Sequence, residues 1–240
     1  MQKKFALAAG AMLLISSVQA SEWGYEGQSG PEHWGDIAPE CSLGKNQSPI
    51  DITRSVEADL SPLTVNYTGN LVSLTNNGHT LEAHVEGDNS FTINGNTFTL
   101  KQFHFHTPSE NLIHGKQFPL EAHFVHADSK NNLAVIALMF DVGEANPQIA
   151  SLISTLPAKG DTITFDQSFP VSAWLPRIGE DYYRFSGSLT TPPCSEGVRW
   201  FVLQNNKDLS QAQVDVLHKA MGDNNRPIQP LNARLVLDAD

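Results

Sequence analysis

Residues 102–106 alternate polar and aromatic side chains, and this stretch constrains the fold of the chain more than any other. Successive side chains of a β-strand point to opposite faces. Gln102, His104 and His106 therefore share one face of a strand, and Phe103 and Phe105 share the other. The pattern predicts a strand whose phenylalanines enter a hydrophobic core while its two imidazoles converge on the opposite side.

A second alternating segment covers residues 121–126. Glu121, His123 and Val125 share one face of the predicted strand. His126 has the opposite parity, so we do not expect it to join His123 at one site.

The histidines at 104, 106 and 123 fit the ligand set of a catalytic zinc site. Such a site keeps three protein ligands around a tetrahedral Zn²⁺ and leaves the fourth position open for water. An imidazole ligand also needs a partner for its other ring nitrogen. Gln102 and Glu121 each lie two residues before a ligand on the same face, so they are candidate partners. The alternative is ordinary polar alternation on a strand, with no metal.

Short segments separated by turn-forming residues run through most of the chain, a pattern typical of an antiparallel sheet. Clusters of Asn and Gly at 76–78, 87–89 and 94–96 are strong turn signals. The predicted strands cover residues 63–67, 71–75, 80–86, 90–93, 97–106, 120–127, 133–141, 182–187 and 198–204.

Two segments have helical patterns. Asn146 caps one that runs through Leu156, and Ser210 starts another that ends at Gly222. No repeat, low-complexity tract or linker divides residues 21–240, so we interpret them as one domain. Residues 21–50 are rich in Gly, Pro and Trp, and we expect them to form coil laid over its surface.

The first 20 residues have the pattern of a cleaved secretory signal peptide. Lys3 and Lys4 precede a short, mostly apolar run over residues 5–18, and residues 18–20 form a small-residue cleavage pattern. The run is too short for a comfortable membrane span, and the alternatives are an uncleaved anchor or a buried helix. The sequence therefore predicts export, with the periplasm as the expected compartment and the surrounding medium as the alternative.

The charge and the cysteines narrow the class of protein further. The chain has 15 basic and 26 acidic residues, a net charge of −11. This acidic excess argues against binding nucleic acid or an anionic membrane surface, because both require a basic footprint.

Cys41 and Cys194 are the two cysteines, and in an oxidising compartment they most simply pair in a disulfide. Two free buried thiols are the alternative.

Further motifs follow one another in a fixed order. They are WGY at 23–25, GPEHW at 30–34, NQSPID at 46–51, NGH at 77–79, PSE at 108–110, SLTTPPC at 188–194, RP at 226–227 and QPLN at 229–232. Together with residues 102–106 and 121–126 they resemble the α-class carbonic anhydrases, and in particular the exported bacterial ones. The resemblance covers nearly all of residues 23–235.

The resemblance implies a mainly β (α+β) fold, with a large, mostly antiparallel twisted central sheet and a few short peripheral helices. It implies a zinc-dependent hydro-lyase that interconverts carbon dioxide and bicarbonate by attack of zinc hydroxide, with a histidine as proton shuttle. The zinc ligands of the family correspond to His104, His106 and His123. Sulfonamides and anions are the expected inhibitors. Bacterial relatives are often dimeric, so a homodimer and a monomer both stay open.

Other positions of the site are implied by the same resemblance. Thr190 and Glu110 correspond to the pair that orients the attacking hydroxide, and His79 corresponds to the proton shuttle. Tyr25 and Asn77 correspond to residues that order water in the cleft. The residues that correspond to the cleft lining and to the apolar wall for carbon dioxide are Thr191, Val125, Val135, Leu189, Val198 and Trp200.

The remaining histidines have no predicted role at the site. His33 and His126 are expected to be buried structural residues, and His84, His114 and His218 to be surface or packing residues.

Two other functions stay open. A non-catalytic binding module on this fold usually lacks a ligand histidine, whereas this chain keeps all three. A dedicated zinc esterase is not supported by any H-E-x-x-H motif or serine nucleophile elbow.

Overall fold

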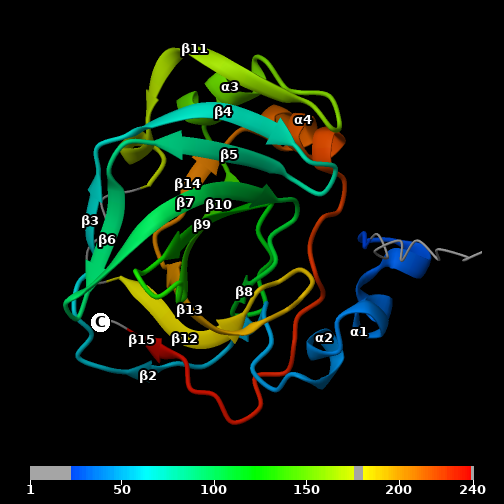
Figure 1. Cartoon of the computed structure of the whole chain (residues 1–240), viewed down its shortest axis with the longest axis vertical. Helices are drawn as coiled ribbons and strands as arrows, with labels where there is room; N and C mark the ends of the chain where they lie inside the picture. The colour runs from blue at the N-terminus through cyan, green and yellow to red at the C-terminus, as the bar shows by residue number, and fades with distance from the viewer. Residues whose placement is uncertain (1–22, 176–180, 239–240) are drawn as a thin grey trace, which may run out of the picture.

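The computed structural model describes residues 23–175 and 181–238, and the predicted signal peptide lies outside them. The strands are β1 (Asp51–Ile52), β2 (Val56–Glu57), β3 (Thr64–Tyr67), β4 (Asn70–Asn76), β5 (Leu81–Glu86), β6 (Asn89–Ile93), β7 (Asn96–His106), β8 (Leu112–Ile113), β9 (Leu120–Ala127), β10 (Leu133–Val142), β11 (Thr162–Pro170), β12 (Tyr182–Ser188), β13 (Glu196–Leu203), β14 (Lys207–Leu209) and β15 (Leu237–Asp238). Within the described residues, a sheet of 13 strands dominates the molecule (Figure 1).

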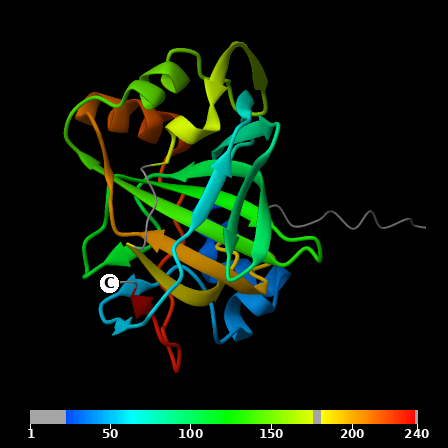
Figure 2. The ribbon, with the colours of Figure 1, turned by 90° about the vertical axis from the view of Figure 1, so that its left-hand side faces the viewer.

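The main path of this sheet runs in the order β11-β4-β5-β7-β9-β10-β13-β12-β15-β2. Strands β3, β6 and β14 pair at its sides, and β1 pairs with β8 separately. Most neighbours are antiparallel, including β5 with β7, β7 with β9, and β9 with β10. Strand β10 pairs in parallel with β13, so the sheet is mixed. Figure 2 shows how the strands rotate along the sheet, which is strongly twisted.

Every predicted strand is present, with ends that differ by at most one or two residues. Strand β11 was not predicted. It lies at the sheet edge, has many exposed residues and carries a register shift between Thr164 and Phe169. Strand β14 and the two-residue strands were not predicted either. These exist because they pair with segments far away in the chain, for which a short sequence window gives no signal.

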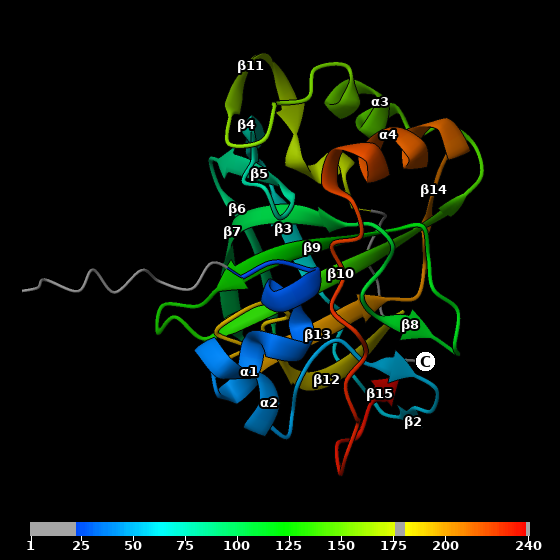
Figure 3. The same ribbon diagram turned by 90° about the vertical axis from the view of Figure 1, so that its right-hand side faces the viewer.

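The helical elements are short and lie at the periphery. They are η1 (Gly27–Ser29), η2 (Pro31–His33), α1 (Trp34–Ile37), α2 (Glu40–Leu43), α3 (Pro147–Ile153), η3 (Val171–Ala173) and α4 (Gln211–Met221). Figure 3 shows α3 and α4 together near β11, and α1 and α2 in another part of the molecule. In the described part of the chain, no helix has the length and apolar character needed to cross a membrane.

Two predictions about helices need correction. The expectation of coil over residues 21–50 is wrong, since η1, η2, α1 and α2 lie there. These single turns depend on tertiary anchors, among them the fully buried Trp34, rather than on a long amphipathic pattern. Helix α3 ends at Ile153, short of Leu156. Helix α4 keeps the predicted caps. Ser210 precedes its first residue and forms a complete capping box, and Gly222 follows its last residue with φ +70°.

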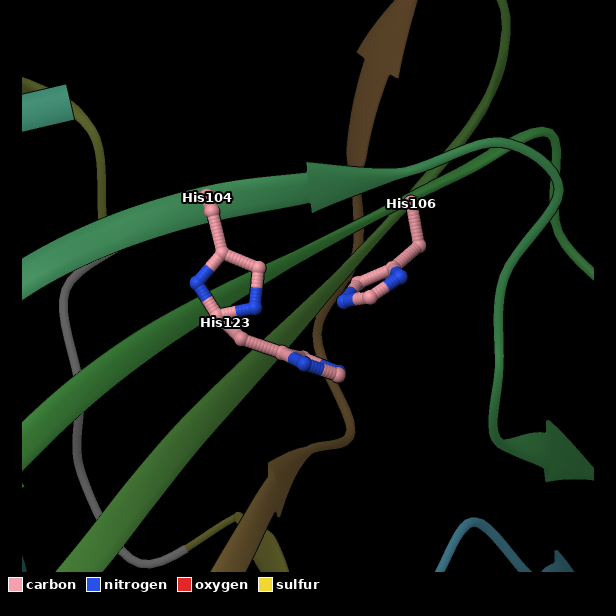
Figure 4. Close-up of side chains that lie close together, drawn as sticks. All are labelled: His104, His106 and His123. Carbon is pink, nitrogen blue, oxygen red and sulfur yellow. The ribbon is translucent and has the colours of Figure 1, made fainter. Parts of the chain in front are cut away.

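The two faces of β7 and β9 meet different surroundings. Phe103, Phe105 and Phe124 are fully buried in the larger hydrophobic cluster of the molecule. The opposite face carries the imidazoles of His104, His106 and His123 (Figure 4). A smaller apolar cluster, which includes Trp200, lies beside them.

Cys41 and Cys194 form a disulfide that joins positions 153 residues apart, as the sequence predicts. The bond attaches α2 to the loop between β12 and β13. The buried Arg226 guanidinium supports the same region from the other side. It donates hydrogen bonds to the carbonyl oxygens of Cys41 and Ser48, both at 2.8 Å, and to Oε1 of Gln47 at 2.9 Å.

Candidate metal centre

The three histidines of the alternating segments converge at one point. His104 lies directly opposite His123 in the β7–β9 ladder, and His106 lies two residues further along β7. Each residue offers one ring nitrogen such that these atoms all lie within 4.8 Å of one another. Figure 4 shows the rings coming together from two neighbouring strands. The placement follows directly from side-chain alternation on adjacent strands.

Two of the rings are held by the predicted partners. Nδ1 of His104 lies 2.8 Å from Oε1 of Gln102. Nε2 of His123 lies 2.8 Å from Oε1 of Glu121, a close polar contact that falls outside the directional limits of a hydrogen bond. These contacts leave Nε2 of His104 and Nδ1 of His123 to face the common point.

The partner of the third ring was not predicted. Nδ1 of His106 donates to the backbone carbonyl oxygen of Asn224 at 2.8 Å, a residue 118 positions away. Asn224 is fully buried, and its side chain also accepts from the Thr107 backbone N–H at 2.7 Å. Nε2 of His106 is buried and has no hydrogen-bond partner. An unpartnered buried nitrogen is costly in a structural histidine but is required of a ligand.

The protonation states suit metal binding. Burial lowers the pKa of His104 and of His123 well below the usual range. The charge of His106 lowers the pKa of both further, and that of His123 also lowers the pKa of His104. Burial also lowers the pKa of His106, although the hydrogen bond to Asn224 opposes the shift. Neutral imidazoles are the form that binds a metal. Three neutral nitrogens aimed at one point fit Zn²⁺ with an open fourth position.

The carboxylate of Glu121 is itself fixed in place. Its Oε2 accepts the backbone N–H groups of Glu110 at 2.7 Å and Asn111 at 2.9 Å. Its Oε1 accepts Nδ2 of Asn111 at 2.7 Å. Burial raises the pKa of Glu121, and these hydrogen bonds pull the pKa back down. The network ties the partner of one ligand to the backbone that carries Glu110.

Glu110 is buried next to the ligands. Its Oε1 accepts the backbone N–H of Arg226 at 2.8 Å. Its Oε2 lies 3.5 Å from Nε2 of His106 and 3.9 Å from Nδ1 of His123. Oε2 makes no hydrogen bond of ordinary length. Burial raises the pKa of this carboxyl strongly, and the Arg226 backbone N–H and the Thr190 hydroxyl lower the pKa again. The carboxylate therefore faces both the ring nitrogens and Thr190.

Thr190 lies in the loop that the disulfide anchors. The Leu189 backbone N–H donates to Ser195 at 3.0 Å, and the Cys194 N–H donates to the Thr191 carbonyl at 2.9 Å. Thr190 is buried, whereas Thr191 is half-buried. The loop thus presents one threonine hydroxyl toward Glu110.

An apolar surface adjoins the site. The Trp200 ring lies 4.9 Å from the His123 ring in an edge-to-face arrangement. The smaller hydrophobic cluster contains Trp200 together with the other residues predicted for the apolar wall, Val125, Val135, Leu189 and Val198. The candidate centre therefore has polar groups on one side and a hydrophobic surface on the other.

Comparison with known proteins decides the family. The sequence model described as eukaryotic-type carbonic anhydrase matches residues 29–239. The chain belongs to the carbonic anhydrase family. A carbonic anhydrase of Neisseria gonorrhoeae is 47% identical over 223 residues, which cover 91% of this chain and 88% of that protein.

Solved structures agree with this assignment. An α-carbonic anhydrase of Photobacterium profundum has a TM-score of 0.88 and 54% identity, and the match covers 90% of this chain and 100% of that one. The α-carbonic anhydrase of Thermovibrio ammonificans, solved in complex with the inhibitor sulfanilamide, has a TM-score of 0.87 and 46% identity, covering 90% and 99%. The chain is thus a carbonic anhydrase by sequence and by fold.

His79, the predicted proton shuttle, lies on the turn before β5. Oδ1 of Asn77 accepts the backbone N–H groups of His79 and Thr80, both at 2.9 Å, which fixes the start of β5. The His79 ring stacks on Trp23 with centroids 3.9 Å apart. His79, Trp23 and Tyr25 line a hollow of about 530 Å³. Burial, and to a smaller degree the charge of Glu110, raise the pKa of Tyr25.

Two histidines outside the centre had been expected to be buried. For His33 this is wrong, because its side chain is 40% exposed and lies 3.6 Å from Asp36 on a surface turn. For His126 it is correct. Its Nε2 lies 2.6 Å from the Tyr67 hydroxyl, and its ring packs edge-on against Phe91 in the core.

Proposed function

We propose that this chain catalyses the reversible hydration of carbon dioxide with Zn²⁺ held by Nε2 of His104, Nε2 of His106 and Nδ1 of His123. The observation that carries the proposal is the convergence of three imidazoles, two of them buried and one half-buried, whose other nitrogens each lie against a polar group. When bound, Zn²⁺ acidifies a water molecule at the open position so that it becomes a nucleophile, the established zinc chemistry of carbonic anhydrases.

Thr190 and Glu110 orient the attacking water. With Oε1 of Glu110 occupied by the Arg226 N–H, Oε2 is available to accept the Thr190 hydroxyl. A threonine that donates to a carboxylate can accept a hydrogen bond only through its oxygen lone pairs. The pair therefore selects an attacking group that still carries a proton, and it aims that group's lone pair toward the substrate.

The apolar wall receives carbon dioxide. The substrate is uncharged and nonpolar, so a hydrophobic surface beside the ligands lowers its cost of desolvation. Val125, Val135, Leu189, Val198 and Trp200 form this wall. Thr191 lies next to Thr190 at the edge of the cleft and contributes a polar contact for bicarbonate.

His79 carries the released proton toward solvent. An imidazole suits this role because it exchanges protons near neutral pH. Asn77 fixes the backbone of the turn that carries His79, and Tyr25 helps to order the water between His79 and the ligands. Trp23, which belongs to the WGY motif but had no predicted role, holds the imidazole by stacking.

We further propose inhibition by sulfonamides and small anions. The Thermovibrio ammonificans relative was solved with sulfanilamide, and this chain shares its fold and has a cluster of three histidines. The anion or the deprotonated sulfonamide nitrogen would compete for the open position. The binding-module alternative has no supporting observation here, because all three ligand histidines are present and converge.

Export to the periplasm is part of the proposal. Residues 1–20 read as a signal peptide, and the Cys41–Cys194 disulfide is of the kind that persists in oxidising compartments. Cell fractionation of the full-length protein tests this. We expect the mature chain in the periplasmic fraction, starting at Ser21, and full-length protein in the cytoplasm would contradict it.

Stopped-flow carbon dioxide hydration tests the function itself. The purified mature protein is assayed as isolated, after removal of metal with a chelator, and after addition of one equivalent of Zn²⁺. We expect activity to disappear with the metal and to return with zinc. Hydration that persists in metal-free protein, or zinc-loaded protein without hydration, would overturn the proposal.

A further inference from the structure

Strand β5 extends the face that carries the three imidazoles. Strand β5 lies beside β7 in the sheet (Figure 1). In their ladder, Glu82 lies opposite His104, and His84 lies opposite Gln102. Cross-strand partners point to the same side of a sheet. The intervening Ala83 is fully buried in the large core on the other side. Glu82 and His84 therefore project on the side of the metal centre, where the sequence analysis expected no role for His84.

The His84 ring is held in place but reaches water. Its Nε2 lies 2.9 Å from the Thr75 hydroxyl, which in turn lies 2.8 Å from the Thr162 hydroxyl. Its Nδ1 lies 3.6 Å from Oε1 of Glu82. The side chain of His84 is 40% exposed and that of Glu82 is 28% exposed. The ring is therefore open to solvent, so a proton taken up there can pass to bulk water.

The groups around the His84 ring are one carboxylate and several neutral polar side chains. The Glu82 carboxylate faces Nδ1, and the Thr75 hydroxyl at Nε2 can either donate or accept a hydrogen bond. The facing groups on β4 are the neutral Ser73 and Thr75, and the group facing from β7 is the amide of Gln102. The next charged side chain along β7 is Lys101.

His84 lies near the proposed metal ligand His104. Diagonal neighbours across an antiparallel pair lie about 7–8 Å apart, which is the relation between His84 and His104. A gap of this size has room for one or two bridging water molecules. His79 lies on the turn before β5 and is stacked on Trp23, so the two histidines approach the centre from different positions of one hairpin.

We propose that His84 is a second proton acceptor of this site, oriented by Glu82 and Thr75 and working in parallel with His79. The proton released by the reaction passes through cleft water. One water oxygen takes up the released proton while one of its O–H bonds breaks, and an N–H bond forms at the ring nitrogen that carried no hydrogen. A base in solution later removes that proton and restores the neutral ring. The inference rests on the proposed function, since it concerns the proton which that reaction releases.

The test compares His79→Ala, His84→Gln and the double variant in stopped-flow carbon dioxide hydration at low and at high imidazole. Glutamine keeps a side chain that can bond Thr75. We expect the double variant to have a kcat about tenfold below that of His79→Ala at low imidazole, because only water then accepts the proton. Added imidazole should restore kcat, and kcat/KM should stay unchanged, because proton export follows the hydration step.

His114→Asn is the matched control, since it removes an exposed histidine away from this face. It should leave kcat at low imidazole unchanged. A double variant with the kcat of His79→Ala would overturn the inference, and so would a loss that appears equally in kcat/KM and resists imidazole. Either result leaves the proposed function intact if the wild-type protein hydrates carbon dioxide. A wild-type protein that does not catalyse carbon dioxide hydration would contradict the proposed function instead.

Discussion

His123 and His126 lie three residues apart on β9, and both are buried, yet they face opposite sides of the sheet. His126 lies in the core, where it contacts the Tyr67 hydroxyl and the Phe91 ring. His123 contacts the Glu121 carboxylate and keeps one nitrogen directed at two other imidazoles. Burial alone therefore does not make a site. What distinguishes His123 is a charged partner behind the ring and a second nitrogen that lies close to nitrogens of two other imidazoles.

The sharpest test of this comparison removes each ring in turn. His123→Ala should lose stoichiometric zinc and reduce hydration to the uncatalysed background, because two imidazoles no longer define a closed ligand set. His126→Asn, from the same strand, should keep one zinc per chain. Metal analysis and stopped-flow hydration on the same samples measure both, and a His123→Ala protein with full zinc would remove His123 from the ligand set.

Thr190→Val tests the orientation of the attacking group without touching the ligands. Loss of a hydrogen-bonding group at the reacting atoms costs about 10²–10³-fold in rate. We expect a loss of about 10²-fold in kcat/KM with unchanged zinc content, and partial recovery in Thr190→Ser. Equal activity of Thr190→Val and the wild type would show that the hydroxyl has no part in the reaction.

The partner behind the ring can be tested by Glu121→Gln. Mutation of such partners typically lowers metal affinity about 10–100-fold. We expect that weakening in a chelator competition assay, and a smaller one for Gln102→Ala, because Gln102 contributes no charge to His104. An unchanged zinc affinity in Glu121→Gln would mean that the contact behind His123 is incidental.

Much of the site could be predicted from short windows of sequence. The alternation of 102–106 and 121–126 determines which residues share a face, and it predicted the Gln102 and Glu121 contacts correctly. It could not predict Asn224 behind His106, or Arg226 behind Glu110, because more than 100 residues separate each pair. Such contacts follow from how the C-terminal segment folds back over the sheet, and no local periodicity encodes that.

The strands likewise fall into those that the sequence predicts and those that it does not. Strands with regular burial, such as β9, have their predicted bounds, since one face must be apolar. Strand β11 and the two-residue strands lack that signal. Among the histidines, the mistake at His33 has the same origin, because a residue in a short surface turn has no periodic pattern from which to read its exposure.

The core histidine gives the smallest expected effect, on stability. Burial lowers the pKa of His126 from 6.5 to about 3. The unfolded chain takes up the proton below about pH 6.5, and the folded protein does so only near pH 3. The stability from this neutral ring is therefore present above pH 6.5 and lost as the pH falls toward 3.

Denaturant unfolding at pH 7 and pH 5 measures this loss. The free energy of unfolding of the wild type should fall by about 2 kcal/mol more than that of His126→Phe, because the phenyl ring cannot take up a proton. Equal losses in the two proteins would show that His126 does not contribute to the acid sensitivity of the fold.

The central claim, that one face of two adjacent strands holds a single zinc ion through three imidazoles, is tested most directly by X-ray absorption at the zinc edge on the active, purified protein. The account predicts one zinc per chain with three nitrogen neighbours at about 2.0–2.1 Å and one oxygen. A zinc shell containing sulfur or fewer than three imidazoles, or full hydration activity in a sample without zinc, would contradict it.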